Sequence, residues 1–236
     1  MVKKLLRAPI LLCLLLAMAS QAAPPPFEDS IAQRTQACTA CHGKEGRAAS
    51  DGYYPRIAGK PAGYLYHQLL NFRDGRRHYG LMVQMVDPLS EAYLLEIAQY
   101  FSQLDLPYPA PQPSYVTAEV LRRGQTLVQQ GDAARQIPAC VQCHGAALTG
   151  VAPNIPGLLG LPRDYLNAQL GAWRTGLRRA HAPDCMGAVA RQLSLDEVNA
   201  ATNWLAAQPL PANTHPATAL PAVLPGAKAI ACGTAP

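Results

Sequence analysis

The chain has 236 residues, 15% of them charged, and its formal net charge at pH 7 is +5. Three of the basic residues belong to an N-terminal segment with the features of an export signal, so the remainder carries a net charge of only +2. This weak charge does not support a nucleic acid or an anionic membrane as a partner. A chain of this length is expected to form two domains.

Residues 1–22 are typical of a secretory signal peptide, because a basic start precedes a short apolar stretch that ends in small residues. The basic residues are Lys3, Lys4 and Arg7. We expect cleavage after Ala22 and delivery of the mature protein to the periplasm. The apolar stretch is shorter than a typical membrane span, although an uncleaved N-terminal anchor stays open as an alternative.

A first helix is expected to run from about Ser30 into the motif Cys38-Thr-Ala-Cys41-His42-Gly43. Two cysteines three residues apart and followed at once by histidine form the attachment signature of a c-type haem. Each thiol can bond one vinyl group of the porphyrin, and the imidazole then lies under the iron as its proximal ligand. The alternatives are a zinc site, which would need ligands from both copies of the motif, and a redox dithiol, which does not require the histidine.

Two further helices are predicted after this motif. The middle helix covers about 62–74, opening after a proline and ending at Gly75. The last helix begins after Ser90, which is a typical N-cap residue. Two methionines, Met82 and Met85, lie in the predicted loop between these helices.

The second copy of the motif is Cys140-Val-Gln-Cys143-His144-Gly145. The predicted elements around it are a first helix over about 117–130, a loop over 131–138, a middle helix over about 163–175 and a last helix after Ser194. Ser194 and Glu197 are spaced as a capping box. Signals for β-sheet are absent, so the predicted fold class is all-α, with two tandem domains.

The resulting division of the chain is a signal peptide (1–22), an N-terminal domain (23–105), a proline-rich linker (106–116), a C-terminal domain (117–208) and a tail rich in proline and alanine (209–236). We expect the linker to be stiff and extended and the tail to be irregular. Residues of the two domains coincide at one constant offset. The matches include Pro55 with Pro156, Tyr64 with Tyr165, Gln68 with Gln169, and Arg77 with Arg178. This agreement indicates a tandem duplication.

The duplication selects one methionine in each domain as the second axial ligand. Met82 and Met186 each lie seven residues before a Leu-Ser pair that opens the last helix. Met85 corresponds to Val189 and is interpreted as core packing. Methionine as the second ligand suits the iron to electron transfer. The predicted iron ligands are His42 and Met82 in the first domain and His144 and Met186 in the second.

Other residues are candidates for supporting roles. The carbonyls of Pro55 and Pro156 are expected to accept a hydrogen bond from the proximal histidines. Recurring side chains that would neutralise haem propionates or contact the facing domain are Arg73, Arg77, Arg174, Arg178, Tyr64 and Tyr165. Histidines without a counterpart, expected at the surface, are His67, His78, His181 and His215. Tyr100 and Trp204 are expected to pack against the haem or the first helix.

Cys185 and Cys232 are the two cysteines outside the signal segment and the haem motifs. An even number of thiols in an oxidising compartment favours a disulfide, which would hold the tail against the second domain. The alternatives are two free thiols or a role for Cys185 at the iron, since it directly precedes Met186.

Five features recur in both domains: Cys-x-x-Cys-His-Gly, Pro-x-x-x-Gly-x-Pro, Tyr-Leu-x-x-Gln-Leu, Arg-x-Gly-x-Arg and a methionine before Leu-Ser. With this combination the chain resembles the cytochrome c4 family over nearly all of residues 30–207. The resemblance implies two class I cytochrome c folds related by a pseudo-twofold axis, each with a covalently bound haem c. It implies propionate edges that face each other across the domain interface, and electron transfer to terminal oxidases or other periplasmic acceptors. Cys185 beside Met186 and the long tail depart from the family pattern.

The predicted function is therefore that of a periplasmic electron carrier rather than an enzyme. Its expected partners are periplasmic redox proteins, including a terminal oxidase, a reductase or a membrane-bound respiratory complex. Two alternatives stay open. The chain could be the cytochrome subunit of a periplasmic dehydrogenase, with the tail as a docking segment, or an enzyme that oxidises thiosulfate at a haem ligated by Cys185.

Overall fold

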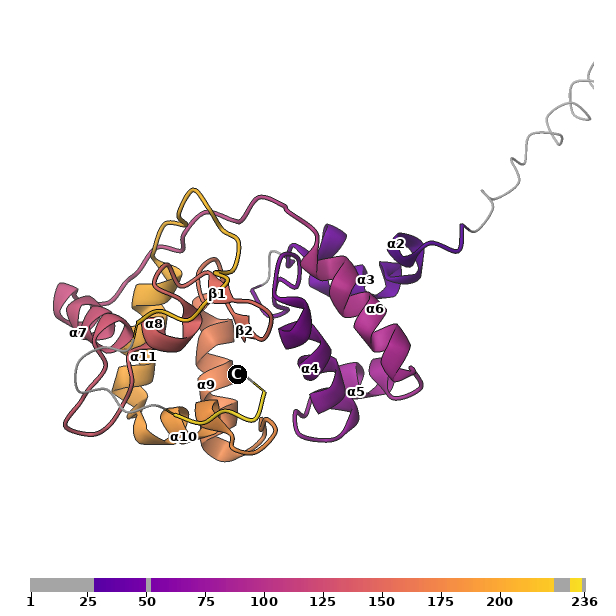
Figure 1. Cartoon of the computed structure of the whole chain (residues 1–236). Helices are drawn as coiled ribbons and strands as arrows, with labels where there is room; N and C mark the ends of the chain where they lie inside the picture. Colours follow the sequence, from indigo (N-terminus) through magenta and orange to yellow (C-terminus); the bar gives the residue numbers. More distant parts are fainter. Residues whose placement is uncertain (1–27, 50–51, 223–229, 235–236) are drawn as a thin grey trace, which may run out of the picture.

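The computed structural model describes residues 28–49, 52–222 and 230–234 of the chain. The predicted signal peptide lies outside these ranges. The described residues form two helical halves that lie side by side and are joined by a segment running over both (Figure 1). Within these ranges, no helix combines the length and the apolar character that a membrane span requires.

The helices of the N-terminal half are α2 (Ile31–Arg34), α3 (Gln36–His42), α4 (Ala62–Arg73), α5 (Gly80–Val86) and α6 (Glu91–Ser102), with a 3-10 turn at Lys44–Gly46. Leu65 of α4 packs against Ile97 and Phe101 of α6, and these apolar side chains are buried together. The predicted first helix is divided at Thr35, whose hydroxyl donates to the Ile31 carbonyl oxygen at 2.8 Å. A hydroxyl that bonds the preceding turn competes with helix propagation, which accounts for the break.

The C-terminal half has the same order of helices: α7 (Ala118–Gln129), α8 (Cys140–His144), α9 (Arg163–Thr175), α10 (Cys185–Gln192) and α11 (Leu195–Ala206). Helices α7 and α11 cross closely at Gly124, where a Cβ would lie 2.2 Å from the Ala200 carbonyl oxygen. Trp204 packs beside the same glycine, so its predicted contact with the first helix is confirmed. Glycine is needed at position 124 because any side chain would separate the two helices.

A small antiparallel hairpin of β1 (Gly150–Val151) and β2 (Ile155–Pro156) interrupts the otherwise helical C-terminal half. The sequence prediction that sheet is absent is wrong at this point. Strands of two residues are too short to show the alternation by which a strand is recognised. The tail extends this hairpin, because Ala217 bonds Gly150 and Ala152 through its backbone at 2.9 and 2.8 Å.

The predicted helix starts are confirmed where a side chain caps them. The Ser90 hydroxyl accepts from the Tyr93 amide, the first amides of α7 are capped by Thr117, and Ser194 forms the predicted capping box with Glu197. Each cap satisfies an amide that has no partner within its own helix. The middle helices instead open after Pro61 and Pro162, as predicted.

The linker has no regular secondary structure but is fastened to the N-terminal half. Buried Arg56 donates to the carbonyl oxygens of Leu106 and Pro107 at 2.6 and 2.9 Å. Its guanidinium also lies over the Tyr108 ring, 3.9 Å from the centroid. The linker therefore adds contacts to the N-terminal half in addition to spanning the two domains.

A local twofold symmetry relates the two halves at their interface, where α4 and α9 lie next to each other (Figure 1). The backbone amide of His78 donates to Leu177 at 3.2 Å, and that of Arg179 donates to Arg76 at 2.6 Å. The twofold exchanges these two hydrogen bonds, since His78 corresponds to Arg179 and Arg76 corresponds to Leu177. The duplication seen in the sequence thus becomes a symmetric contact in space.

Candidate functional site

Each Cys-x-x-Cys-His motif lies at the end of a short helix. Cysteines three residues apart lie on one face of a helix, and α3 and α8 end at His42 and His144. The chain then turns at a glycine with a positive φ, 74° at Gly43 and 86° at Gly145. A Cβ at position 43 would lie 2.3 Å from the Ala48 carbonyl oxygen, so the motif's trailing glycine is required by the turn.

Both motif histidines are buried and are oriented by the same backbone contact. His42 Nδ1 lies 2.8 Å from the Pro55 carbonyl oxygen, and His144 Nδ1 lies 2.7 Å from that of Pro156. When Nδ1 donates its proton to the carbonyl, Nε2 keeps the lone pair that binds a metal. Burial lowers the pKa of both imidazoles and so favours the neutral form. The predicted hydrogen-bond partners of both histidines are confirmed.

All four motif cysteines are partly buried. Burial raises the pKa of Cys140 to about 12, and it also raises the pKa of Cys38 and Cys143. A redox dithiol works through a thiol of lowered pKa, so these thiols lack that property. No three His, Cys, Asp or Glu side chains gather as a metal site in the part of the chain that the structure describes, and the zinc alternative has no ligand set there.

The two predicted methionine ligands occupy equivalent positions in the two domains. Met82 lies on α5 and Met186 on α10, and both side chains are half-buried. The sequence predicts loops here, whereas the structure has helices of seven and eight residues, which are too short to give a clear periodic signal. The interpretation of Met85 as core packing is wrong, since 46% of its surface is exposed. Helix α5 directs Met82 and Val86, one turn apart, toward the apolar cluster instead.

Tyrosines near the N-terminal motif histidine were not singled out by sequence reasoning. The Tyr54 ring lies 6.2 Å from that of His42, and its hydroxyl is 3.3 Å from that of Tyr79. Tyr53 meets Tyr54 edge to face, with ring centroids 5.0 Å apart. The aligned position in the second domain is Ile155, so these aromatic contacts belong to the first domain alone. The sequence feature that could have indicated these contacts is the pair of adjacent tyrosines directly before Pro55.

Recurring arginines and glutamines of the two domains meet across the interface. Arg77 donates to Gln169 at 2.8 Å, and Arg178 donates to Gln68 at 2.7 Å. Each guanidinium also donates to a tyrosine of the facing domain, Tyr165 and Tyr64 respectively. In the described chain these hydrogen bonds go to uncharged amide and hydroxyl oxygens. Two positive charges with neutral partners at one interface are suited to carboxylates such as haem propionates.

The other recurring arginines have a different role. Arg73 forms an ion pair with Glu91 at 2.9 Å, and Arg174 donates to the Leu193 carbonyl oxygen. Both therefore tie a middle helix to the start of the last helix of the same domain. Of the unmatched histidines, His78 and His215 are exposed as predicted. His67 and His181 are half-buried instead, with ring centroids 6.3 Å apart, because the domains approach each other there.

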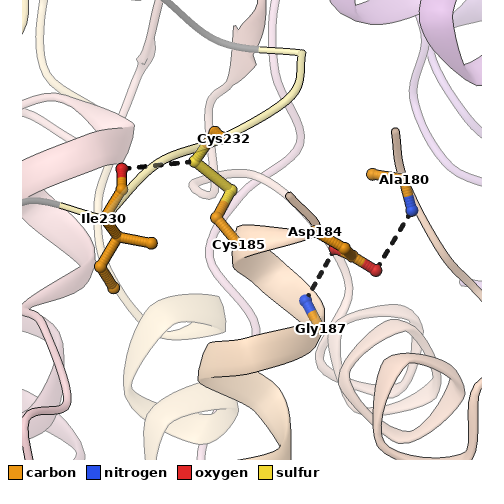
Figure 2. The surroundings of a disulfide bond; sticks show 6 residues. All are labelled: Ala180, Asp184, Cys185, Gly187, Ile230 and Cys232. Carbon is orange, nitrogen blue, oxygen red and sulfur yellow. Dashed lines mark hydrogen bonds between the residues drawn. A yellow bond between two sulfur atoms is a disulfide. The ribbon is translucent and has the colours of Figure 1, made fainter. Parts of the chain in front are cut away.

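The predicted disulfide between Cys185 and Cys232 is confirmed (Figure 2). Cys185 directly precedes Met186 in the chain. Asp184 caps the same end of α10, accepting from the amides of Gly187 at 2.9 Å and Ala180 at 3.2 Å. The tail is thereby fastened to the helix that carries the methionine. A disulfide sulfur is not available as a thiolate ligand, so the structure does not support a role for Cys185 at the iron.

The residues at both motifs fit a covalently bound haem. Each domain offers two thiols in one helical turn, an imidazole with an oriented Nδ1, and a half-buried methionine on the helix before the last one. The interface adds two guanidinium groups whose hydrogen bonds, among the described residues, go to uncharged oxygens. This combination of sulfur, nitrogen and cationic groups matches the attachment, ligation and propionate binding that haem c requires.

Comparisons with known proteins agree with this fit. The chain is 40% identical to a thiosulfate dehydrogenase electron acceptor of Thiomonas intermedia (strain K12), covering 82% of this chain and 85% of the relative. It is 30% identical to a cytochrome c4 of Thiocapsa roseopersicina, covering 78% of this chain and 95% of that protein. No protein-family model matches the chain.

Solved structures show the same relationship. A reduced cytochrome c4 from Pseudomonas stutzeri superimposes with a TM-score of 0.64 at 28% identity, over 75% of this chain and 96% of that one. A thiosulfate dehydrogenase (TsdBA) from Marichromatium purpuratum superimposes with a TM-score of 0.66 at 36% identity, over 73% of this chain and 36% of that one. The predicted all-α fold with two tandem cytochrome c-like domains is thereby confirmed.

Proposed function

Because the chain belongs to the cytochrome c4-like family of di-haem electron carriers, we propose that it accepts electrons from a thiosulfate dehydrogenase and passes them to a second redox protein. The observation that carries this proposal is the repeated ligand geometry of the two domains, together with relatives named for that role. The terminal oxidase or reductase expected from the sequence would be the protein that takes electrons from this chain. The proposed electron donor corresponds to the other expectation, in which the chain is the cytochrome partner of a periplasmic dehydrogenase.

The proposal assigns a role to each residue of the two motifs and to one methionine in each domain. Haem c, when bound, supplies one-electron exchange between ferric and ferrous iron. Covalent attachment is assigned to Cys38 and Cys41 in one domain and to Cys140 and Cys143 in the other. The proximal ligands are His42 and His144, each held in orientation by a proline carbonyl. The distal ligands are Met82 and Met186.

The enzymatic alternative is disfavoured by the disulfide. A thiosulfate-oxidising haem with cysteine ligation would require the Cys185 thiolate, and this sulfur is bonded to Cys232. The same disulfide supports an oxidising compartment, since such bonds persist outside the cytoplasm. We therefore assign the mature protein to the periplasm, where the predicted signal peptide would deliver it.

The proposal is tested with the full chain produced in a host that attaches c-type haem in its periplasm. We expect two haems per chain, and magnetic circular dichroism of the ferric protein should show methionine ligation at both. A thiosulfate dehydrogenase supplied with thiosulfate should then reduce both haems, whereas thiosulfate without the dehydrogenase should not. Direct reduction by thiosulfate alone would contradict the carrier role. Failure of the dehydrogenase to reduce a correctly loaded protein would contradict the proposed donor.

A further inference from the structure

Lys60 is a buried lysine at the domain interface, and only 4% of its surface is exposed. It lies two residues before the start of α4 in the N-terminal domain, yet its ammonium Nζ donates to the carbonyl oxygen of Gly157 in the C-terminal domain at 3.0 Å. Gly157 follows Pro156, whose carbonyl oxygen receives the Nδ1 hydrogen bond of His144. Lys60 thus contacts the backbone that orients the proximal histidine of the other domain.

The position of Lys60 is unfavourable for stability. Burial, together with the smaller effect of the nearby Arg56 charge, lowers its pKa to about 7. The residue also lies at the N-terminus of α4, where the helix dipole opposes a positive charge. A buried charge in such surroundings weakens the fold unless another interaction offsets it. Groups of this kind occur preferentially at functional sites.

The twofold symmetry of the interface is broken at this lysine. The aligned residue of the C-terminal domain is Leu161, which is buried in an apolar cluster and brings no charge toward His42. The electrostatic surroundings of the two histidines differ accordingly. The Lys60 ammonium contacts the backbone next to the carbonyl that holds His144, whereas Leu161 has no charged or polar group with which to make the twofold-related contact beside His42.

We propose that Lys60 is a positioning residue of the N-terminal domain that raises the reduction potential of the C-terminal haem and leaves that of the N-terminal haem nearly unchanged. A positive charge near the iron favours the ferrous state, which carries one positive charge fewer. The same charge makes the His144 imidazole a weaker electron donor, which acts in the same direction. The inference rests on the proposed function, because it requires a haem ligated by His144.

The experiment is a redox titration of the full chain at about pH 6, where the Lys60 ammonium is largely protonated. K60Q removes the charge and keeps a hydrogen-bond donor, whereas K60M removes both. We expect both variants to decrease the ferrous-to-ferric ratio of the C-terminal haem about tenfold at a fixed ambient potential, which corresponds to about 59 mV for one electron. The N-terminal haem should shift by less than a third of that amount.

Three further variants make the result unambiguous. M82H and M186H each lower the potential of one haem and so assign the two titration waves to their domains. L161M alters the packing of the twofold-related position without a change in charge, and it should leave both potentials unchanged. An unchanged C-terminal potential in K60Q, or equal shifts of both haems, would overturn the inference. Fewer than two haems per wild-type chain would instead contradict the proposed function.

Discussion

The two domains orient their motif histidines in the same way but support the helices that carry Met82 and Met186 differently. The histidine–carbonyl distances are 2.8 Å for His42 and 2.7 Å for His144. Helix α5, which carries Met82, is held by an apolar cluster with Val86 at its end. Helix α10, which carries Met186, is held instead by an Asp cap and a disulfide to the tail. Duplication has thus kept the orientation of the motif histidines, whereas the supports of the two helices that carry the proposed sixth ligands have diverged.

The largest expected effect is a loss of haem, which tests whether each motif attaches haem independently of the other domain. Replacing Cys38 and Cys41 by serine, or Cys140 and Cys143 by serine, should decrease the haem content from two per chain to one, because each pair attaches one porphyrin. The measurement is the pyridine haemochrome content of purified protein. Retention of two covalent haems in either variant would contradict independent attachment. Loss of both would show that the interface makes loading of the two domains interdependent.

The second prediction concerns the distal ligands. M82H and M186H should each lower the potential of one haem by about 0.1 V or more, since histidine stabilises ferric iron relative to methionine and axial ligation spans about 0.8 V. M85H is the matched control, because Met85 is an exposed neighbour on α5. A potentiometric titration distinguishes the variants. A lowered potential in M85H together with an unchanged one in M82H would reverse the assignment.

The parts of the site that depend on the spacing of residues close in the chain could be predicted from the sequence. The helical turn between Cys38 and His42, the capping box at Ser194 and the equivalent places of Met82 and Met186 are all set by residues close in the chain. The disulfide followed from counting, since two thiols were left over in an oxidising compartment. These features need no knowledge of how the domains meet.

Three features that depend on local backbone geometry or on contacts between distant residues were not predicted. The Lys60 contact joins residues 97 positions apart, and no repeat could indicate it because its counterpart is a leucine. The hairpin at residues 150–156 is stabilised by the tail through Ala217, which periodicity does not reveal. Met85 was misplaced because a seven-residue helix, rather than a loop, directs its side chain outward.

The third prediction compares the stabilities of the two domains. The double variant C185S/C232S should decrease the free energy of unfolding of the C-terminal domain by about 2–4 kcal/mol, because the disulfide closes a loop of 47 residues and restricts the unfolded chain. Denaturant unfolding followed by the absorption of each haem measures it. The N-terminal domain should be unaffected and provides the internal control. Equal destabilisation of both domains would show that the tail also supports the interface.

The smallest expected effect concerns Glu197, whose aligned residue in the first domain is Tyr93. Buried Glu197 completes the capping box of α11 and accepts hydrogen bonds from Arg135 and Arg123. The hydrogen bond from Arg135, with those from Ser194 and Arg123, lowers the pKa of Glu197 to about 2. E197Q keeps an acceptor but removes the charge, so it should destabilise the C-terminal domain by about 1 kcal/mol at pH 7.

The pH dependence separates this charge from simple packing. A carboxyl with a lowered pKa in the folded state stabilises the fold above its ordinary pKa of 4.5, and this stabilisation is lost as the pH falls toward about 2. The difference between wild type and E197Q in the unfolding of the C-terminal domain should therefore shrink between pH 5 and pH 3. A difference that is constant over this range would mean that the amide disturbs packing. The Glu197 charge would then contribute nothing to the difference in stability between the two domains.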